Sequence, residues 1–146
     1  MLQPLSDLHI TKAADLGEVK PLLAACRLPT NDIRDDGTFL VARAGPAVCG
    51  VAGLETLGSV GLLRSVAVDP AWRRRGVAQA LVAALVDRAR ADGMRRLFLL
   101  TTDADRYFSR LGFAALDREA LPAQVRATEQ FRETCPQAAI AMARDL

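Results

Sequence analysis

The sequence has little histidine or cysteine, and each shortage removes a class of protein from consideration. His9 is the only histidine, so a histidine-based triad or metal site would depend on one residue near the N-terminus. The cysteines Cys26, Cys49 and Cys135 are far apart and form no CxxC pair, which argues against a zinc site or a disulfide framework. We expect no bound metal, and we interpret His9 as an ordinary strand-edge residue.

Long apolar runs and a strong net charge are also missing. The uncharged runs are much shorter than the roughly 18 residues that a membrane span needs. Residues 1–10 include an aspartate and lack the apolar centre of a signal peptide. The formal net charge of +2 is too small to favour nucleic acid. The sequence therefore predicts a cytoplasmic protein with neither a membrane nor a nucleic acid as partner.

Arginine supplies most of the positive charge. Lys12 and Lys20 are the only lysines, and the other 17 basic residues are arginines. The planar guanidinium suits phosphate and carboxylate groups, although genomic base composition is a simpler cause for most of them. With 146 residues and 51% hydrophobic content, the chain fits a single domain over residues 1–146 with a buried core.

Strand-like and helix-like segments alternate, which is typical of an α/β or α+β domain. Asp15 and Glu18 suggest a capping box at the start of a first helix. The expected strands are 8–12, 38–44, 48–55, 58–68, 96–102, 113–116 and 138–143, the last of which closes the sheet. The other expected helices are 76–91, 103–111 and 121–132, and residues 28–36 are expected to form a polar loop or short helix. The strands 38–44, 48–55 and 58–68 resemble an antiparallel meander.

The stretch from Val66 to Ala80 has the clearest chemical content. An apolar strand ends at Asp69-Pro70, a basic turn containing Gly76 follows, and a long amphipathic helix begins directly after it. The first N–H groups of a helix have no intrahelical partner, and the helix dipole adds positive charge there. This arrangement suits a pyrophosphate. A solvated basic turn before an ordinary helix is the alternative.

Two motifs carry a resemblance to a known family. The turn has neither the GxxxxGK[ST] nor the GxGxxG pattern. Arg73-x-x-Gly76-x-Ala78, after Val66-Ala67-Val68-Asp69-Pro70, resembles the acetyl-CoA signature of the GNAT superfamily of N-acetyltransferases. Tyr107 to Phe113 resembles the helix of that family that ends in FYEKLGF.

Finer similarities suggest a branch of the family. Segments 53–55, 61–65 and 97–102 resemble arsenic-resistance N-acetyltransferases, as does a tail with Arg126-Ala127-Thr128, Phe131 and Cys135-Pro136. Segment 97–102 and Phe113 also resemble the acetyltransferase domain of N-acetylglutamate synthase. Both groups act on small amino acids or their mimics.

The resemblance implies the GNAT fold, a mixed and mostly antiparallel sheet of about six to seven strands flanked by helices. The fourth and fifth strands, 58–68 and 96–102, would splay apart and admit acetyl-CoA as co-substrate. A backbone N–H near Val66 or Ala67 would serve as oxyanion donor. The implied cofactor-binding residues are Val66, Ala67, Val68, Arg73, Arg74, Arg75, Gly76, Val77, Ala78, Gln79 and Phe108.

Four residues are candidates for the acceptor side. An amine must lose a proton before it attacks, and Glu55 is the only acid between Asp36 and Asp69. Glu55 is therefore the candidate base, with an exposed strand-end residue as the alternative. Arg64 lies in an apolar strand and needs a partner, either a substrate carboxylate or an acid such as Glu55. Thr101 and Thr102 could bind the substrate or be satisfied strand-end hydroxyls.

The chain departs from the family at the residue that often protonates the leaving thiolate. That tyrosine position is Phe108, and Tyr107 lies about 100° further round the helix. Tyr107 is a weak candidate acid, and Arg126 is a further candidate substrate-binding residue. Trp72 is interpreted as a half-buried packing residue.

The sequence therefore favours acetyl transfer to a small-molecule amine acceptor, such as phosphinothricin or an arsenical glutamate analogue. Glutamate acetylation for arginine synthesis and a non-catalytic acyl-CoA-binding module are the alternatives. A homodimer is possible, because dimers are common in the superfamily.

Overall fold

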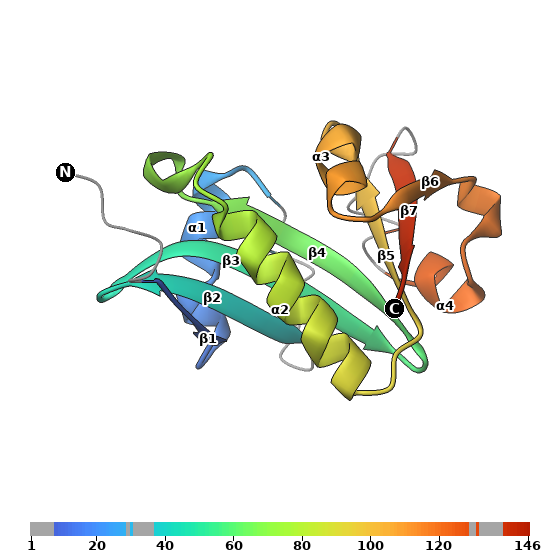
Figure 1. Ribbon diagram of the computed structural model, residues 1–146, viewed down its shortest axis with the longest axis horizontal. Coiled ribbons are helices and arrows are strands. Elements are labelled where there is room, and N and C mark those ends of the chain that lie inside the picture. Colours follow the sequence, from blue (N-terminus) through green and yellow to red (C-terminus); the bar gives the residue numbers. More distant parts are fainter. Residues whose placement is uncertain (1–7, 29, 31–36, 129–130, 132–138) are drawn as a thin grey trace.

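One seven-stranded mixed sheet organises the chain (Figure 1). A computed structural model describes residues 8–28, 30, 37–128, 131 and 139–146. The strands are β1 (Leu8–Lys12), β2 (Thr38–Ala44), β3 (Ala47–Leu57), β4 (Val60–Val68), β5 (Arg96–Thr101), β6 (Ala114–Leu116) and β7 (Ile140–Asp145). Their order is β1-β2-β3-β4-β5-β7-β6, with β2, β3 and β4 as the expected antiparallel meander. The predicted fold class is confirmed.

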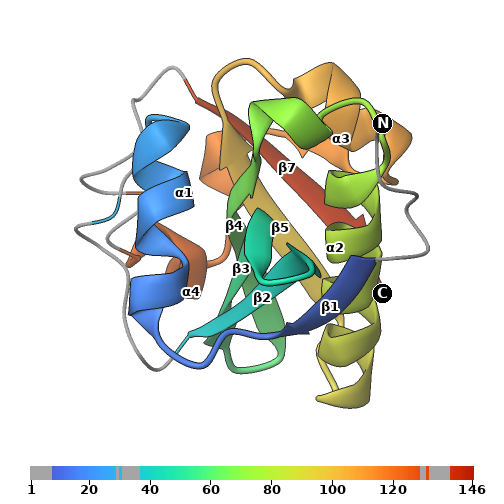
Figure 2. The ribbon, with the colours of Figure 1, turned by 90° about the vertical axis from the view of Figure 1, so that its left-hand side faces the viewer.

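Helices cover both faces of this sheet (Figure 2). They are α1 (Lys20–Ala25), α2 (Val77–Ala91), α3 (Asp105–Arg110) and α4 (Ala123–Arg126). Single 3₁₀ turns occur at Leu16–Glu18, Pro70–Trp72 and Arg118–Ala120. The hydrophobic clusters place α2 and α3 on one face and α1 and α4 on the other. We call these the α2 face and the α1/α4 face.

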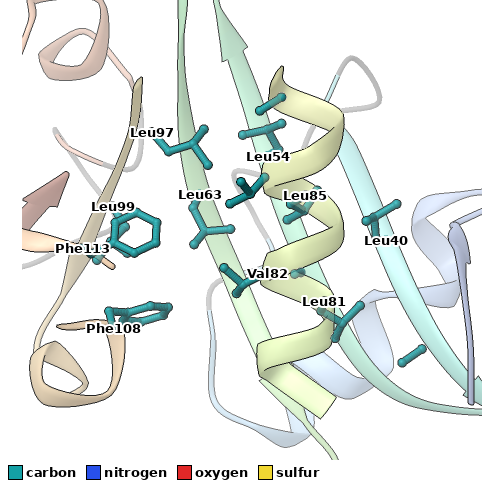
Figure 3. Packing of buried hydrophobic residues seen from close by; sticks show 14 of the residues in the cluster. Leu40, Leu54, Leu63, Leu81, Val82, Leu85, Leu97, Leu99, Phe108 and Phe113 are labelled. Carbon is teal, nitrogen blue, oxygen red and sulfur yellow. The ribbon is translucent and has the colours of Figure 1, made fainter. Parts of the chain in front are cut away.

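Helix α2 packs across the meander because its apolar residues recur at helical spacing. Figure 3 shows Leu81, Val82 and Leu85 of α2 directed at the strands, with Phe108 and Phe113 closing the cluster beside β5. Gly50 of β3 permits the close approach, since a Cβ there would lie 2.7 Å from Cγ1 of Val77. The first turn of α2 is thereby held tightly against the sheet.

Strands β4 and β5 are paired over only part of their length. They run parallel, and the pairs stop at Leu62 with Phe98. Beyond this point β5 pairs only with β7 among the described strands, and Figure 1 shows β4 and β5 diverging. The register between β3 and β4 also shifts near Ser65, whose φ is +57°. The predicted splaying of these two strands is confirmed.

The N-terminal helix begins differently from the prediction. The Asp15 side chain makes no cap hydrogen bond, and a 3₁₀ turn precedes α1. Glu18 instead pairs with Arg43 and accepts from the backbone N–H of Ala14, so the capping box was wrong. Pro21 lies in the first turn of α1, where a missing N–H breaks no intrahelical bond.

The C-terminal elements differ in extent from the prediction. Of the helix expected over 121–132, the described residues show α4 at Ala123–Arg126 and a helical residue at Phe131. The strand expected over 138–143 is β7, which is shifted by two residues and completes the sheet between β5 and β6. Most of the loop at 28–36, residues 129, 130 and 132, Cys135-Pro136 and residue 138 lie outside the described residues.

Candidate functional site

A basic turn, residues 69–76, joins β4 to α2. The Asp69 carboxylate opens the turn by accepting the N–H of Ala71 at 2.9 Å. Arg74 and Gly76 have φ values of +62° and +81°, in the left-handed region that favours glycine. These two positions reverse the chain so that α2 begins directly beside the end of β4.

The start of α2 provides N–H groups for an anion. The bond from Ala80 N to Gly76 O, 3.0 Å long, is the first of the helix. The N–H groups of Val77, Ala78 and Gln79 precede it and have no intrahelical acceptor. No acidic side chain lies in this first turn, so the positive end of the dipole is not neutralised locally. These features fit a pyrophosphate, as the sequence predicts.

The three arginines of the turn have different surroundings. Arg73 donates from Nε to the carbonyl of Val68 at 3.1 Å. Arg75 stacks over Trp72, with Cζ 4.2 Å from the ring centroid, and Arg74 is exposed. Trp72 is half-buried against the α2 cluster, which confirms its interpretation as a packing residue.

The open edge of β4 continues from the turn. Past Leu62, no described strand pairs with β4 on the side of β5. Val66 and Val68 pack into the α2 cluster, while Ala67 packs on the α1/α4 face. An extended ligand with amide groups could therefore add to this edge as a further strand would.

A groove of about 370 Å³ lies between α2 and α3. Gln79 and Val82 line one side, and Arg110 and Gly112 line the other. Arg144 of β7 also lines it and donates from Nη1 to Leu111 O at 2.8 Å. The groove begins at Gln79, beside the N–H groups of α2, and its two arginines suit a phosphorylated group.

Glu55 and Arg64 meet on the α1/α4 face. Nη1 of Arg64 lies 2.8 Å from Oε1 of Glu55, and Nε donates to Ser65 Oγ at 3.0 Å. Strand alternation places both side chains on the face of Leu62, which packs beside α4. The pair lies just beyond the last β4–β5 pairing. The structure thus shows the acidic partner that the sequence left open for Arg64.

The other acceptor candidates are spread around this region. Thr101 Oγ1 accepts the N–H of Ala104 at 3.0 Å, so this hydroxyl supports the start of α3. Thr102 is exposed at the end of β5, and Arg126 is exposed on α4. The structure brings together only Glu55 and Arg64 from this group.

Tyr107 and Phe108 occupy different environments on α3. Phe108 is buried and packs edge-to-face on Phe113, with centroids 5.9 Å apart. Tyr107 is half-buried and packs edge-to-face on Phe108 at 5.5 Å. Burial raises the pKa of the Tyr107 hydroxyl, against the opposing effect of Arg110. Its proton is therefore retained at neutral pH.

Sequence reasoning missed three residues at the site. Ser65 has no sequence signal for its positive φ, and Arg144 lies far along the chain from the helix that it approaches. Nothing in the sequence indicates a contact between Cys26 and the end of β4, yet its Sγ lies 3.7 Å from Val68 O. These three are brought to the site by strand pairing and helix packing, which local patterns do not reveal.

The described part of the chain contains neither a metal-binding cluster nor a membrane-spanning helix. Within residues 8–28, 30, 37–128, 131 and 139–146, no three His, Cys, Asp or Glu residues are grouped to hold a metal ion. No helix in those ranges has the length and apolar character of a membrane span.

The chain thus combines a split sheet with a helix start whose first N–H groups have no intrahelical acceptor, an arrangement that suits a long phosphorylated ligand. The model of the acetyltransferase (GNAT) family matches residues 8–113. The chain belongs to that family.

Individual relatives agree with this assignment. The chain is 36% identical to the amino-acid acetyltransferase of Mycobacterium tuberculosis over 89 residues, which are 60% of this chain and 48% of that protein. N-acetylglutamate synthase from Neisseria gonorrhoeae, complexed with coenzyme A and N-acetyl-glutamate, matches with TM-score 0.78 and 23% identity, over 95% of this chain and 35% of that one. A GNAT-family acetyltransferase from Staphylococcus aureus matches with TM-score 0.76 and 17% identity, over 95% and 99% of the two chains. The structural matches show the fold, and the chain spans less than half of the first two proteins.

Proposed function

We propose that the chain transfers the acetyl group of acetyl-CoA to the amine of a small amino acid or amino-acid-like compound. One observation carries the proposal: β4 and β5 part after Leu62, directly beside the basic turn and the start of α2. This arrangement can accept an amide-containing arm and a diphosphate that are covalently joined.

Acetyl-CoA would extend from the gap between β4 and β5 to the start of α2. Its arm would pair with the backbone of Val66 and Val68, and its diphosphate would bind the N–H groups of residues 76–79. Arg74 and Arg75 would add charge, and the groove beside Arg110 would receive the adenosine end. Phe108 would support the arm from its buried position.

The reaction would be a direct attack in a ternary complex. Glu55 would take a proton from the ammonium group, directly or through water, and Oε1 would remain bound to Arg64. The amine nitrogen would then attack the thioester carbon, and the N–H near Val66 or Ala67 would stabilise the oxyanion. A C–N bond forms, the C–S bond breaks, and CoA leaves as a thiolate. The nitrogen would give up its surplus proton as the amide forms, and this proton would pass to the thiolate through Tyr107 or water.

The acceptor would be a small molecule that carries a carboxylate. Arg64 and Arg126 supply positive charge on the α1/α4 face, and Thr101 and Thr102 lie at the end of β5. The sequence resemblances favour a glutamate mimic such as phosphinothricin or an arsenical analogue. The relatives' names, amino-acid acetyltransferase and N-acetylglutamate synthase, favour glutamate itself as the second candidate.

Thiol-release kinetics with acetyl-CoA would test the proposal. The panel would include glutamate, phosphinothricin, an arsenical glutamate analogue, other amino acids, polyamines and a lysine peptide. Turnover of the mimics above glutamate supports detoxification, whereas preference for glutamate supports the biosynthetic role. Binding of acetyl-CoA without turnover of any acceptor would contradict the enzyme proposal and favour an acyl-CoA-binding module.

A further inference from the structure

The last carbonyl of β4 is the meeting point of three segments. Val68 O accepts from Arg73 Nε at 3.1 Å and from Cys26 Sγ at 3.7 Å. Nη2 of Arg73 also lies 3.7 Å from Cys26 Sγ. Strand β4, the basic turn and the end of α1 are thus joined through the side chain of Arg73.

These contacts orient the guanidinium of Arg73 toward α1. Cys26 follows the last residue of α1 and packs against the cluster on the α1/α4 face. The N–H groups of Val77, Ala78 and Gln79 belong to the first turn of α2, which lies on the opposite face of the sheet. The side chain of Arg73 is therefore bound to the protein on the side away from the anion-binding groups.

We propose that Arg73 is a positioning residue, which holds the basic turn through the carbonyl of Val68 and does not contact phosphate. The inference rests on the proposed function, because it assumes that acetyl-CoA binds at this turn. It reassigns Arg73, which the sequence motif suggested as a direct ligand.

The turn has a physical need for such a restraint. Arg74 and Gly76 both adopt left-handed backbone conformations, and Arg74 lacks the freedom of glycine. The bond from Ala71 N to Asp69 holds the first half of the turn, and the bond from Arg73 to Val68 holds the second. Without the second bond, the N–H groups at the start of α2 would have to be ordered by the ligand, which weakens binding.

Two substitutions separate the roles of geometry and charge. In glutamine, Nε2 is bonded to Cδ at the position that Nε has in arginine. Arg73→Gln therefore keeps an N–H donor for Val68 O and removes the charge, whereas Arg73→Met keeps similar length and removes both. Arg88→Gln is the matched control, since Arg88 is exposed about 17 Å along α2 from Val77.

The measurement is the Kd of CoA by titration calorimetry at several salt concentrations, together with kcat and KM for acetyl-CoA. We expect the Kd of CoA for Arg73→Gln to lie within about threefold of the Kd for the unaltered chain. The Kd for Arg73→Met should be about tenfold higher, which corresponds to the loss of one net hydrogen bond. The loss should fall on KM with kcat nearly unchanged, and the salt dependence should stay the same.

The inference would be overturned if Arg73→Gln did not bind CoA more tightly than Arg73→Met. If Arg73→Gln and Arg73→Met weaken CoA binding equally and both flatten its salt dependence, Arg73 contacts phosphate through its charge. If the unaltered chain does not bind CoA, the proposed function fails and the inference fails with it. Normal CoA binding by the unaltered chain with the wrong ranking of variants overturns only the role of Arg73.

Discussion

A nearly buried guanidinium holds a carboxylate that is still open to solvent: Arg64 and Glu55 are bonded at 2.8 Å, with side chains 3% and 28% exposed. Arg64 occupies Oε1 of Glu55 and also binds Ser65, the residue at the register shift of β4. In the described residues no donor is bound to Oε2 of Glu55. The pair thus combines a fixed orientation with a carboxylate acceptor that is partly open to solvent.

Glu55→Gln removes this acceptor and keeps the side-chain shape. We expect kcat to fall by about 10²–10⁴, the usual contribution of a general base, while the Kd of CoA stays unchanged. Steady-state kinetics and calorimetry measure the two quantities. Glu119→Gln, at an exposed acid of the 3₁₀ turn 118–120, is the control. Full activity of Glu55→Gln would exclude Glu55 as the base.

Arg64→Met should destabilise the chain. It leaves Ser65 and Glu55 without their charged donor, and loss of hydrogen bonds from a buried charged group costs about 1–3 kcal/mol. Urea unfolding followed by circular dichroism measures the free energy of unfolding. Arg90→Met should change it by less than about 0.5 kcal/mol, since Arg90 is exposed. Equal stability of the two variants would contradict the structural role of Arg64.

Tyr107 should make stability depend on alkaline pH. Because burial raises its pKa, the folded chain favours the protonated hydroxyl. This contribution is fully present below the ordinary tyrosine pKa of about 10 and is lost as pH rises through the higher pKa of the folded state. Tyr107→Phe should therefore lose less stability than the unaltered chain between about pH 9 and 11. Parallel curves of unfolding free energy against pH would show that the burial has no such effect.

A comparison of Gly76 with Gly93 can separate the effect of the basic turn on CoA binding from its effect on stability. They flank α2 with φ values of +81° and +83°, so alanine is strained at both by about 1–2 kcal/mol. Only Gly76 lies beside the proposed diphosphate site. We expect both variants to lose similar stability, and only Gly76→Ala to weaken CoA binding. A similar loss of CoA affinity in Gly93→Ala would mean that the effect is a general loss of stability.

Cys26 should react with a thiol reagent much faster than Cys49. Cys49 is 1% exposed, donates to Ala42 O, and has its pKa raised by burial. Cys26 is only half-buried beside Arg73. Iodoacetamide labelling followed by peptide mass spectrometry resolves the two sites. Faster modification of Cys49 would indicate that the sheet opens before α1 moves.

The sequence predicts well those parts of the fold that depend on local patterns. The amphipathic helix α2, the meander β2–β4 and the splayed pair β4–β5 all follow from periodicity or from the motif around Arg73 and Gly76. Each of these features depends on a pattern of residues that are near one another in the sequence. The sequence resemblance to the family also rests in part on the stretch around Arg73 and Gly76, and the family model matches the wider range 8–113.

Contacts between distant segments were less predictable. An arginine in an apolar strand signals a partner, but only the antiparallel register brings Arg64 to Glu55. Strand-end hydroxyls are equally compatible with substrate binding and with bonding to the backbone, and Thr101 accepts the N–H of Ala104 just before α3. The position of β7 inside the sheet could not be read either, because pairing order is a property of the whole chain.

The position of β7 has a consequence for how the chain folds during synthesis. β7 follows all the other described strands in the sequence, yet it separates β5 from β6 and pairs with both. The meander β1–β4 can form early, whereas β6 has no partner among the described strands until residues 140–145 have left the ribosome. The sheet is therefore completed by a late insertion, and nascent chains that stall before β7 would expose two unpaired strand edges to chaperones and to aggregation.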